Sequence, residues 1–140
     1  MFSATRLLGA TMRQTRVLVA DDNDSFGAVL GRFVAVHGDM VVVGRASSGQ
    51  EAVAMTDALM PDVVLMDLYM TGMDGFEATR VLSATHPEVK VVAITAHRSA
   101  ETERLSLEAG ARAFLNKTDA DTLLIDVIRG LAGTDADLHC

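Results

Sequence analysis

Residues 63–75 read VVLMDLYMTGMDG, and this stretch decides the fold. An unbroken apolar run from Val63 to Met66 leads directly into Asp67 and a glycine-containing loop. A short run of this kind is typical of a strand that is buried on both faces of a parallel sheet. A carboxylate directly after such a strand is poorly explained as a surface charge that only keeps the protein soluble. Asp67 is therefore a candidate functional residue.

Three further apolar runs lead into polar residues in the same way. The pairs of run and residue are 17–20 with Asp21 and Asp22, 91–94 with Thr95, and 113–115 with Lys117. If all four runs are parallel strands, their carboxyl ends meet at one edge of the sheet, where ligands of open α/β sheets bind. The sequence therefore predicts a single site built from residues that are far apart in the chain.

Between these runs the apolar spacing becomes helical. One helix face is predicted after the first run and another near the end of the chain: Phe26, Val29, Leu30, Phe33 and Val34, then Leu123, Leu124, Val127, Ile128 and Leu131. Ser48 to Glu51 has the pattern of a capping box, Asp74 introduces a helix, and Ser99 caps another helix that Gly110 ends. With one more strand at 40–43, strands alternate with helices. Such crossovers predict an α/β fold with a parallel sheet covered on both faces.

Composition limits the class of protein. A chain of 140 residues, 49% of them hydrophobic, is expected to form one domain. A net charge of -7 argues against direct nucleic-acid contact and favours a cation or a basic partner. The single cysteine, Cys140, excludes an internal disulfide, and no apolar run approaches transmembrane length. We therefore expect a cytoplasmic location and no membrane contact.

The ends of the chain differ from its centre. We interpret residues 1–15 as an N-terminal arm, 16–131 as the folded domain and 132–140 as a tail or a truncated linker. The arm contains Arg6 and Arg13 but no acidic residue, and it is too weakly apolar for a secretory signal. Because Met12 lies just before the domain, translation from Met12 instead of Met1 stays an open alternative.

The polar residues that follow the apolar runs form an ordered set. Its members are Asp21 and Asp22, Asp67 within 63–75, Ile94-Thr95-Ala96 and Lys117. This set resembles the receiver domain of bacterial two-component response regulators, over residues 16 to about 131. The resemblance implies a doubly wound, flavodoxin-like sheet of five parallel strands in the order 2-1-3-4-5. The absence of proline after Lys117 and the ending at 127–133 look like receivers attached to helix-turn-helix output domains.

Three carboxylates at neighbouring strand ends repel one another, and a hard divalent cation with oxygen ligands relieves that repulsion. The resemblance implies that this cation is Mg²⁺. By similarity, Asp22 and Asp67 bind it through their side chains, Asp21 mainly through water, and Tyr69 through its backbone carbonyl.

The resemblance also implies how the domain is phosphorylated. Asp67 accepts a phosphoryl group from a sensor histidine kinase, while Lys117 and Thr95 stabilise the transferring oxygens. The protein is then a signalling receiver that catalyses only its own phosphorylation and dephosphorylation.

The output that the resemblance implies is a switch formed by Thr95 and Phe114, which biases a surface on the fourth and fifth predicted helices and the fifth predicted strand. Ordinary strand packing is an equally open interpretation of Phe114. A homodimer through those two helices is a hypothesis that rests on the family.

Some positions depart from the family's commonest pattern. The family usually has proline where Thr71 stands, so this loop lacks a fixed φ. Thr118 replaces a proline that often follows the lysine, and a cis bond before it is unfavourable. Tyr69 and His97 flank the expected phosphoryl site, where they can shield it or orient attacking water.

Other interpretations stay open. Taken singly, the aspartates are ordinary helix caps, Thr95 is a strand residue and Lys117 is a surface charge. Two other function classes are a pseudo-receiver that binds partners without phosphorylation and a Mg²⁺-dependent phosphatase with an aspartyl-phosphate intermediate. Such phosphatases commonly carry a second aspartate two residues after the nucleophile, where this chain has Tyr69.

Overall fold

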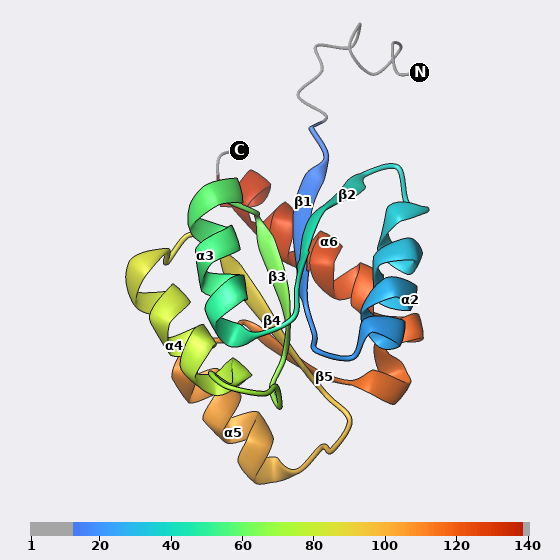
Figure 1. The fold of residues 1–140 in the computed structure, drawn as a ribbon. Coiled ribbons are helices and arrows are strands. Elements are labelled where there is room, and N and C mark those ends of the chain that lie inside the picture. Colours follow the sequence, from blue (N-terminus) through green and yellow to red (C-terminus); the bar gives the residue numbers. More distant parts are fainter. Residues whose placement is uncertain (1–12, 139–140) are drawn as a thin grey trace, which may run out of the picture.

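The computed structural model describes residues 13–138, with side chains described through residue 132. The strands in this part of the chain form one parallel sheet in the order β2-β1-β3-β4-β5, which confirms the predicted topology (Figure 1). The elements are β1 (Thr15–Ala20), α2 (Asp24–Ala35), β2 (Met40–Ala46), α3 (Gly49–Leu59), β3 (Val63–Asp67), α4 (Gly75–Thr85), β4 (Lys90–Thr95), α5 (Ala100–Ala109), β5 (Ala113–Asn116), the 3-10 turn η1 (Lys117–Asp119) and α6 (Ala120–Leu138).

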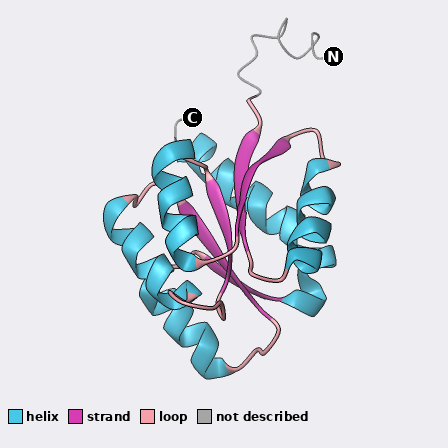
Figure 2. Cartoon of the chain, in the orientation of Figure 1, coloured by secondary structure: helices cyan, strands magenta, loops and turns pink. Residues whose placement is uncertain are grey.

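Helices cover both faces of the sheet (Figure 2). On one face, α2 and α6 pack through Leu30, Val34, Leu124 and Ile128 against alternate residues of the strands. On the other face, residues of α3 and α4 such as Ala52 pack against the strand residues that point the opposite way. The central strands are buried on both sides, which explains why their sequences are continuously apolar.

Two predicted helix faces differ in detail from the structure. Val29 is 54% exposed and Leu123 is 46% exposed, whereas Ile125 is buried. Leu123 and Ile125 flank Leu124 on opposite sides of α6, and the sheet covers the side of Ile125. Apolar spacing locates the buried stripe of a helix but does not determine how far the helix is rotated about its axis.

The capping box predicted at residues 48–51 forms only in part. Ser48 caps α3 by accepting a hydrogen bond from the Glu51 N–H at 3.1 Å. The carboxylate of Glu51 accepts hydrogen bonds from the N–H and the hydroxyl of Ser47 instead of from the Ser48 N–H. At α5, by contrast, Ser99 and Thr102 cap one another reciprocally.

The described elements extend beyond the predicted limits of the folded domain, residues 16 and 131, at both ends. Strand β1 begins at Thr15, the last residue of the predicted arm, and α6 continues to Leu138 through most of the predicted tail. The assignment of 132–140 as a linker stays a prediction. Met12 and Cys140 lie outside the described residues. Within the part that is described, no helix is both long enough and apolar enough to cross a membrane.

Candidate functional site

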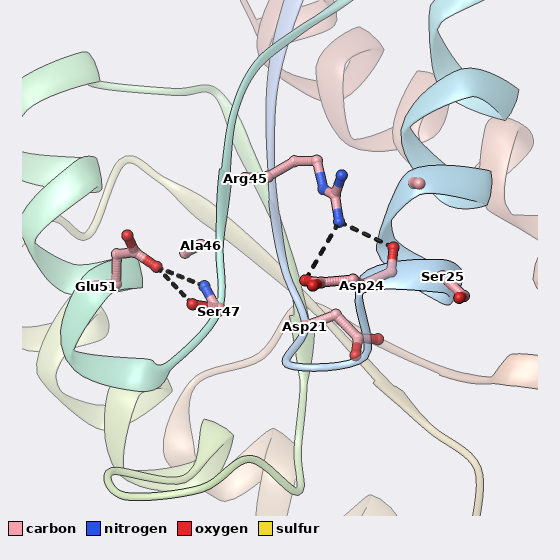
Figure 3. A pocket seen from close by; sticks show the side chains of 8 residues that line it. Asp21, Asp24, Ser25, Arg45, Ala46, Ser47 and Glu51 are labelled. Carbon is pink, nitrogen blue, oxygen red and sulfur yellow. Dashed lines mark hydrogen bonds and ion pairs between the residues drawn. The ribbon is translucent and has the colours of Figure 1, made fainter.

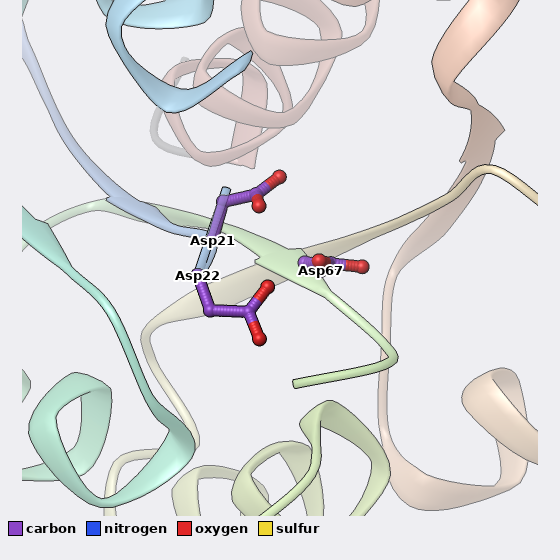
Figure 4. Close-up of side chains that lie close together, drawn as sticks. All are labelled: Asp21, Asp22 and Asp67. Carbon is purple, nitrogen blue, oxygen red and sulfur yellow. The ribbon is translucent and has the colours of Figure 1, made fainter. Parts of the chain in front are cut away.

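The carboxyl ends of β1 and β3 bring three aspartates together. Oxygen atoms of Asp21, Asp22 and Asp67 all lie within 4.8 Å of one another (Figure 4). The two strands are adjacent, with Ala20 paired to Met66, so the residues that follow each strand meet at one edge. Asp21 is 4% and Asp67 is 6% exposed, whereas Asp22 faces solvent. The predicted grouping of these carboxylates is therefore present.

Backbone hydrogen bonds fix the two buried carboxylates. The Asp21 N–H donates to the carbonyl of Ala46 at 2.9 Å, and the Asp21 side chain accepts from the Asn23 N–H at 2.7 Å. Asp67 Oδ1 accepts from the N–H of Tyr69 at 3.2 Å. Each side chain is thus held by the strand or loop that carries it.

A close helix–strand contact also holds the backbone of Asp67. Helix α4 begins at Gly75, whose N–H donates to the carbonyl of Leu68 at 2.9 Å. A Cβ atom at Gly75 would overlap the carbonyl of Asp67. Only glycine permits this approach, which lets α4 start directly beneath the aspartate.

Lys117 brings a positive charge into the acidic cluster. Its ammonium nitrogen lies 3.0 Å from Asp21 Oδ2 and 3.6 Å from Asp67 Oδ2. The lysine opens η1, a turn that Asn116 caps by accepting a hydrogen bond from the Thr118 N–H. The peptide bond after Lys117 is trans, as are all the other described peptide bonds. The cis bond that often follows this lysine in the family is therefore absent.

Burial and repulsion make Asp67 harder to ionise. Burial, and after it the charge of Asp21, raises the pKa of Asp67 from its ordinary value of 3.8 to about 6. Lys117 and the Tyr69 N–H oppose this increase by stabilising the carboxylate. A pair of buried carboxylates beside one lysine is an arrangement that a divalent cation would relieve.

The remaining predicted residues lie around this cluster. Thr95 is fully buried at the end of β4, beside β3, and its hydroxyl oxygen accepts a hydrogen bond from the His97 N–H at 3.1 Å. Tyr69 is 50% exposed and packs edge-on against Phe76. Phe114 is half-buried and packs against the core on the α3 and α4 side of the sheet. Its part in a switch stays a prediction.

Comparison with known proteins identifies the family. The model of the response regulator receiver domain matches residues 17–129. This chain belongs to that family.

Several named regulators are similar to this receiver. GacA of Pseudomonas viridiflava is 40% identical over 114 residues, which cover 81% of this chain and 53% of GacA. The transcriptional regulatory protein LiaR of Bacillus subtilis is 38% identical over 124 residues, which cover 89% of this chain and 59% of LiaR. The receiver thus spans little more than half the length of these relatives.

Solved structures support the same assignment. The signal receiver domain of NarL from Mycobacterium tuberculosis has a TM-score of 0.77 and 31% identity, and the match covers 84% of this chain and 98% of that one. The response regulator domain of CheB from Thermotoga maritima has a TM-score of 0.79 and 29% identity, covering 85% and 96%.

The receiver site also contains contacts that sequence reasoning missed. Asp22 accepts hydrogen bonds from the backbone and the hydroxyl of Thr71, a position singled out only for its lack of proline. The ring of Phe26 lies against Lys117, although its spacing indicated only a core-facing residue. Gln50 holds the loop after β3 through Met73, and no signal in the sequence marked it.

A polar depression adjoins the acidic cluster of the receiver. Its volume is about 570 Å³, and its lining residues are Asp21, Asp24, Ser25, Ala28, Arg45, Ala46, Ser47 and Glu51 (Figure 3). Arg45 donates to the carbonyl of Asp24 at 3.0 Å, and Glu51 is engaged by Ser47 (Figure 3). Arg45 and Glu51 therefore already have hydrogen-bond partners within the receiver itself.

Proposed function

We propose that this receiver accepts a phosphoryl group from the phosphohistidine of a sensor histidine kinase onto Asp67, in a reaction that requires Mg²⁺. The observation that carries the proposal is the contact geometry of Asp67. The carboxylate lies beside Asp21 and Asp22 and 3.6 Å from the ammonium nitrogen of Lys117, at the edge of the sheet. A nucleophile, a cation site and a fixed positive charge are the groups that phosphoryl transfer requires.

The residues of the chain have distinct parts in this transfer. An oxygen of the Asp67 carboxylate forms a bond to phosphorus while the bond from phosphorus to the imidazole nitrogen breaks, and the leaving imidazole takes up a proton. Lys117 stabilises negative charge on the transferring oxygens, because its ammonium group is already held at the site by Asp21. Thr95, at the end of the neighbouring strand, supplies a hydroxyl donor to a phosphoryl oxygen.

The donor set fits Mg²⁺, since it consists of oxygen atoms from three aspartates that lie close together. Asp22 and Asp67 would bind the cation through their side chains, Asp21 mainly through water, and Tyr69 through its backbone carbonyl. Once bound, Mg²⁺ neutralises carboxylate and phosphoryl charge.

We further propose how phosphorylation is transmitted. Thr95 moves toward the phosphoryl group, and Phe114 then turns into the space behind it, which changes the surface formed by β5, α5 and α6. A homodimer through α5 and α6 is one use of that surface. Control of transcription by an attached DNA-binding domain is another, and the similarity to LiaR, a transcriptional regulatory protein, supports it. A cytoplasmic location stays a prediction.

Intact mass spectrometry tests the central proposal. The protein is incubated with acetyl phosphate, with and without Mg²⁺, beside Asp67→Asn as the matched control. We expect one phosphoryl group on the unsubstituted protein, only with metal, and none on Asp67→Asn. Lys117→Gln should be phosphorylated much more slowly although its acidic cluster is intact.

A negative result would favour one of the two other function classes. A folded protein that gains no phosphoryl group would favour a pseudo-receiver that binds its partners constitutively. Steady turnover of a small phosphorylated substrate would instead favour a phosphatase. Tyr69 argues against that class, because it occupies the position where those enzymes commonly have a second aspartate.

A further inference from the structure

The loop between β3 and α4 places two donors on the most exposed aspartate of the cluster. The backbone N–H of Thr71 lies 3.1 Å and its hydroxyl oxygen 3.3 Å from Asp22 Oδ2. Both donors converge on one carboxylate oxygen, although the two residues are separated by 49 positions in the sequence. The other oxygen of Asp22 is left for a different ligand.

The loop that carries these donors is itself anchored to α3. The Met73 N–H donates to Gln50 Oε1 at 3.2 Å, and the Gly49 N–H donates to the Met73 carbonyl at 3.1 Å. A Cβ atom at Gly49 would overlap that carbonyl, so the helix start and the loop are in close contact. Gly72 has a φ of +81°, which shapes the turn between Thr71 and Met73. The Thr71 donors therefore come from a segment with a defined position.

Proline at position 71, the commonest residue in the family, could make neither of these hydrogen bonds. It has no backbone N–H and no hydroxyl group. The departure at Thr71 therefore removes a fixed φ but adds two hydrogen-bond donors to a candidate metal ligand. Anchoring through Asp22, Gln50 and Gly49 replaces the constraint that proline would provide.

We propose that Thr71 is a positioning residue for the divalent cation, holding the Asp22 carboxylate at the mouth of the acidic cluster before the metal binds. This inference rests on the proposed function, because it concerns the same cation site. An exposed aspartate next to two buried carboxylates is driven outward by repulsion and is free to rotate. Donors on one oxygen counter both effects and keep the side chain where a cation can reach it.

Isothermal titration calorimetry with MgCl₂ alone tests this role without any readout of phosphorylation. The variants are Thr71→Ser, which keeps both donors, Thr71→Val, which removes the hydroxyl, and Thr71→Pro, which removes both. Thr85→Val is the matched control, because its exposed hydroxyl bonds within α4 at the opposite edge of the sheet. Circular dichroism confirms that each variant is folded.

We expect Thr71→Ser and Thr85→Val to bind Mg²⁺ like the unsubstituted protein. Thr71→Val should bind about 3-fold more weakly, through the loss of one hydrogen bond. Thr71→Pro should bind about 10-fold more weakly, at the lower end of the loss that is usual for residues that orient metal ligands. Equal affinity in all Thr71 variants would overturn the role of Thr71 and leave the cation site intact. No Mg²⁺ binding by the unsubstituted protein would overturn the proposed metal-dependent function itself, and this inference with it.

Discussion

The ammonium nitrogen of Lys117 lies 4.4 Å from the centre of the Phe26 ring. The same nitrogen is paired with Asp21 at 3.0 Å, so a carboxylate and an aromatic face hold the lysine together. A cation over an aromatic ring is stabilised by roughly 0.5 to 2 kcal/mol, with the larger value for desolvated pairs. Since Lys117 is mostly buried, the ring of Phe26 helps to aim the charge at the acidic cluster.

Replacing Phe26 with leucine should slow phosphorylation of Asp67. The substitution keeps an apolar side chain on α2 but removes the face on which Lys117 rests. We expect the rate of phosphorylation by acetyl phosphate at saturating Mg²⁺ to fall by about 3-fold to 10-fold, which corresponds to the loss of one cation–π contact. Intact mass measured over time gives the rate.

Phe26→Tyr is the control for this prediction, since it retains the aromatic face. Its rate should stay close to that of the unsubstituted protein. If Phe26→Leu and Phe26→Tyr were phosphorylated at the same rate, the ring would be a packing element only.

The stability of the metal-free protein should depend on pH through Asp67. Its pKa in the folded state is raised to about 6 from the ordinary value of 3.8. This group therefore favours folding fully below about pH 3.8, and the contribution is lost as the pH rises through about 6. Asp67→Asn cannot ionise, so it should be more stable than the parent at about pH 8, by on the order of 2 kcal/mol.

Urea unfolding with a chelator present measures this difference, which should shrink toward zero near about pH 4. Asp39→Asn is a control with the opposite sign. The Arg129 side chain holds the pKa of Asp39 below its ordinary value, so the ionised carboxylate stabilises the folded state and the benefit is lost as the pH falls. Parallel pH profiles for the two variants would contradict the role of Asp67 burial.

Two glycine-to-alanine substitutions should change stability in opposite directions. Gly110 ends α5 with a φ of +118°, and a Cβ atom there would overlap the Ser83 side chain. Gly110→Ala should therefore lower the free energy of unfolding by about 2 to 3 kcal/mol. Gly130 lies within α6 with open space around its Cβ position, so Gly130→Ala should raise that free energy by up to about 1 kcal/mol.

Urea unfolding at a single pH measures both values, and each variant serves as the control for the other. A stabilising Gly110→Ala would mean that α5 can end without a left-handed residue.

Removing the Tyr69 side chain should shorten the lifetime of the phosphorylated protein. The ring is 50% exposed, is held edge-on against Phe76, and lies two residues after the candidate phosphoacceptor. If it shields the phosphoryl group from water, Tyr69→Ala should lose that group about 3-fold faster, a change of under about 1 kcal/mol in the barrier. Loss of phosphoryl mass after removal of acetyl phosphate gives the rate.

Tyr69→Phe keeps the ring and its contact but not the hydroxyl, so its lifetime should match that of the parent. A shortened lifetime in Tyr69→Phe would assign the effect to the hydroxyl group instead of to shielding.

The sheet and the acidic cluster could be predicted from the sequence because the first depends on the apolar pattern and the second on which residues follow the strands. Continuous apolar runs alternating with helical spacing leave little choice besides a parallel sheet. In such a sheet, residues that follow adjacent strands must meet, which is why Asp21 and Asp67, after β1 and β3, come together as predicted. Lys117 follows β5, which is adjacent to neither strand, and its long side chain reaches both aspartates along the same edge. The strand order itself came from the resemblance to receivers.

Contacts that depend on side-chain direction or loop path could not be predicted in this way. Periodicity placed Phe26 on a buried helix face, but the ring packs against a lysine from the other end of the domain. The hydrogen bonds of Thr71 depend on where the loop after β3 passes Asp22. Whether Leu123 or Ile125 is buried depends on the rotation of α6 about its axis, which the apolar spacing does not determine.

Helix α6 returns along the sheet and ends near the edge where β1 begins (Figure 1). The three aspartates lie at the other edge, where β1 and β3 end. Anything joined to the chain beyond α6 is therefore separated from Asp67 by the full length of the strands. Under the proposed function, such an attachment would sense phosphorylation of Asp67 only through a change in helix packing. The phosphoryl-transfer chemistry proposed for Asp67 would then be independent of the kind of attachment at the opposite edge of the sheet.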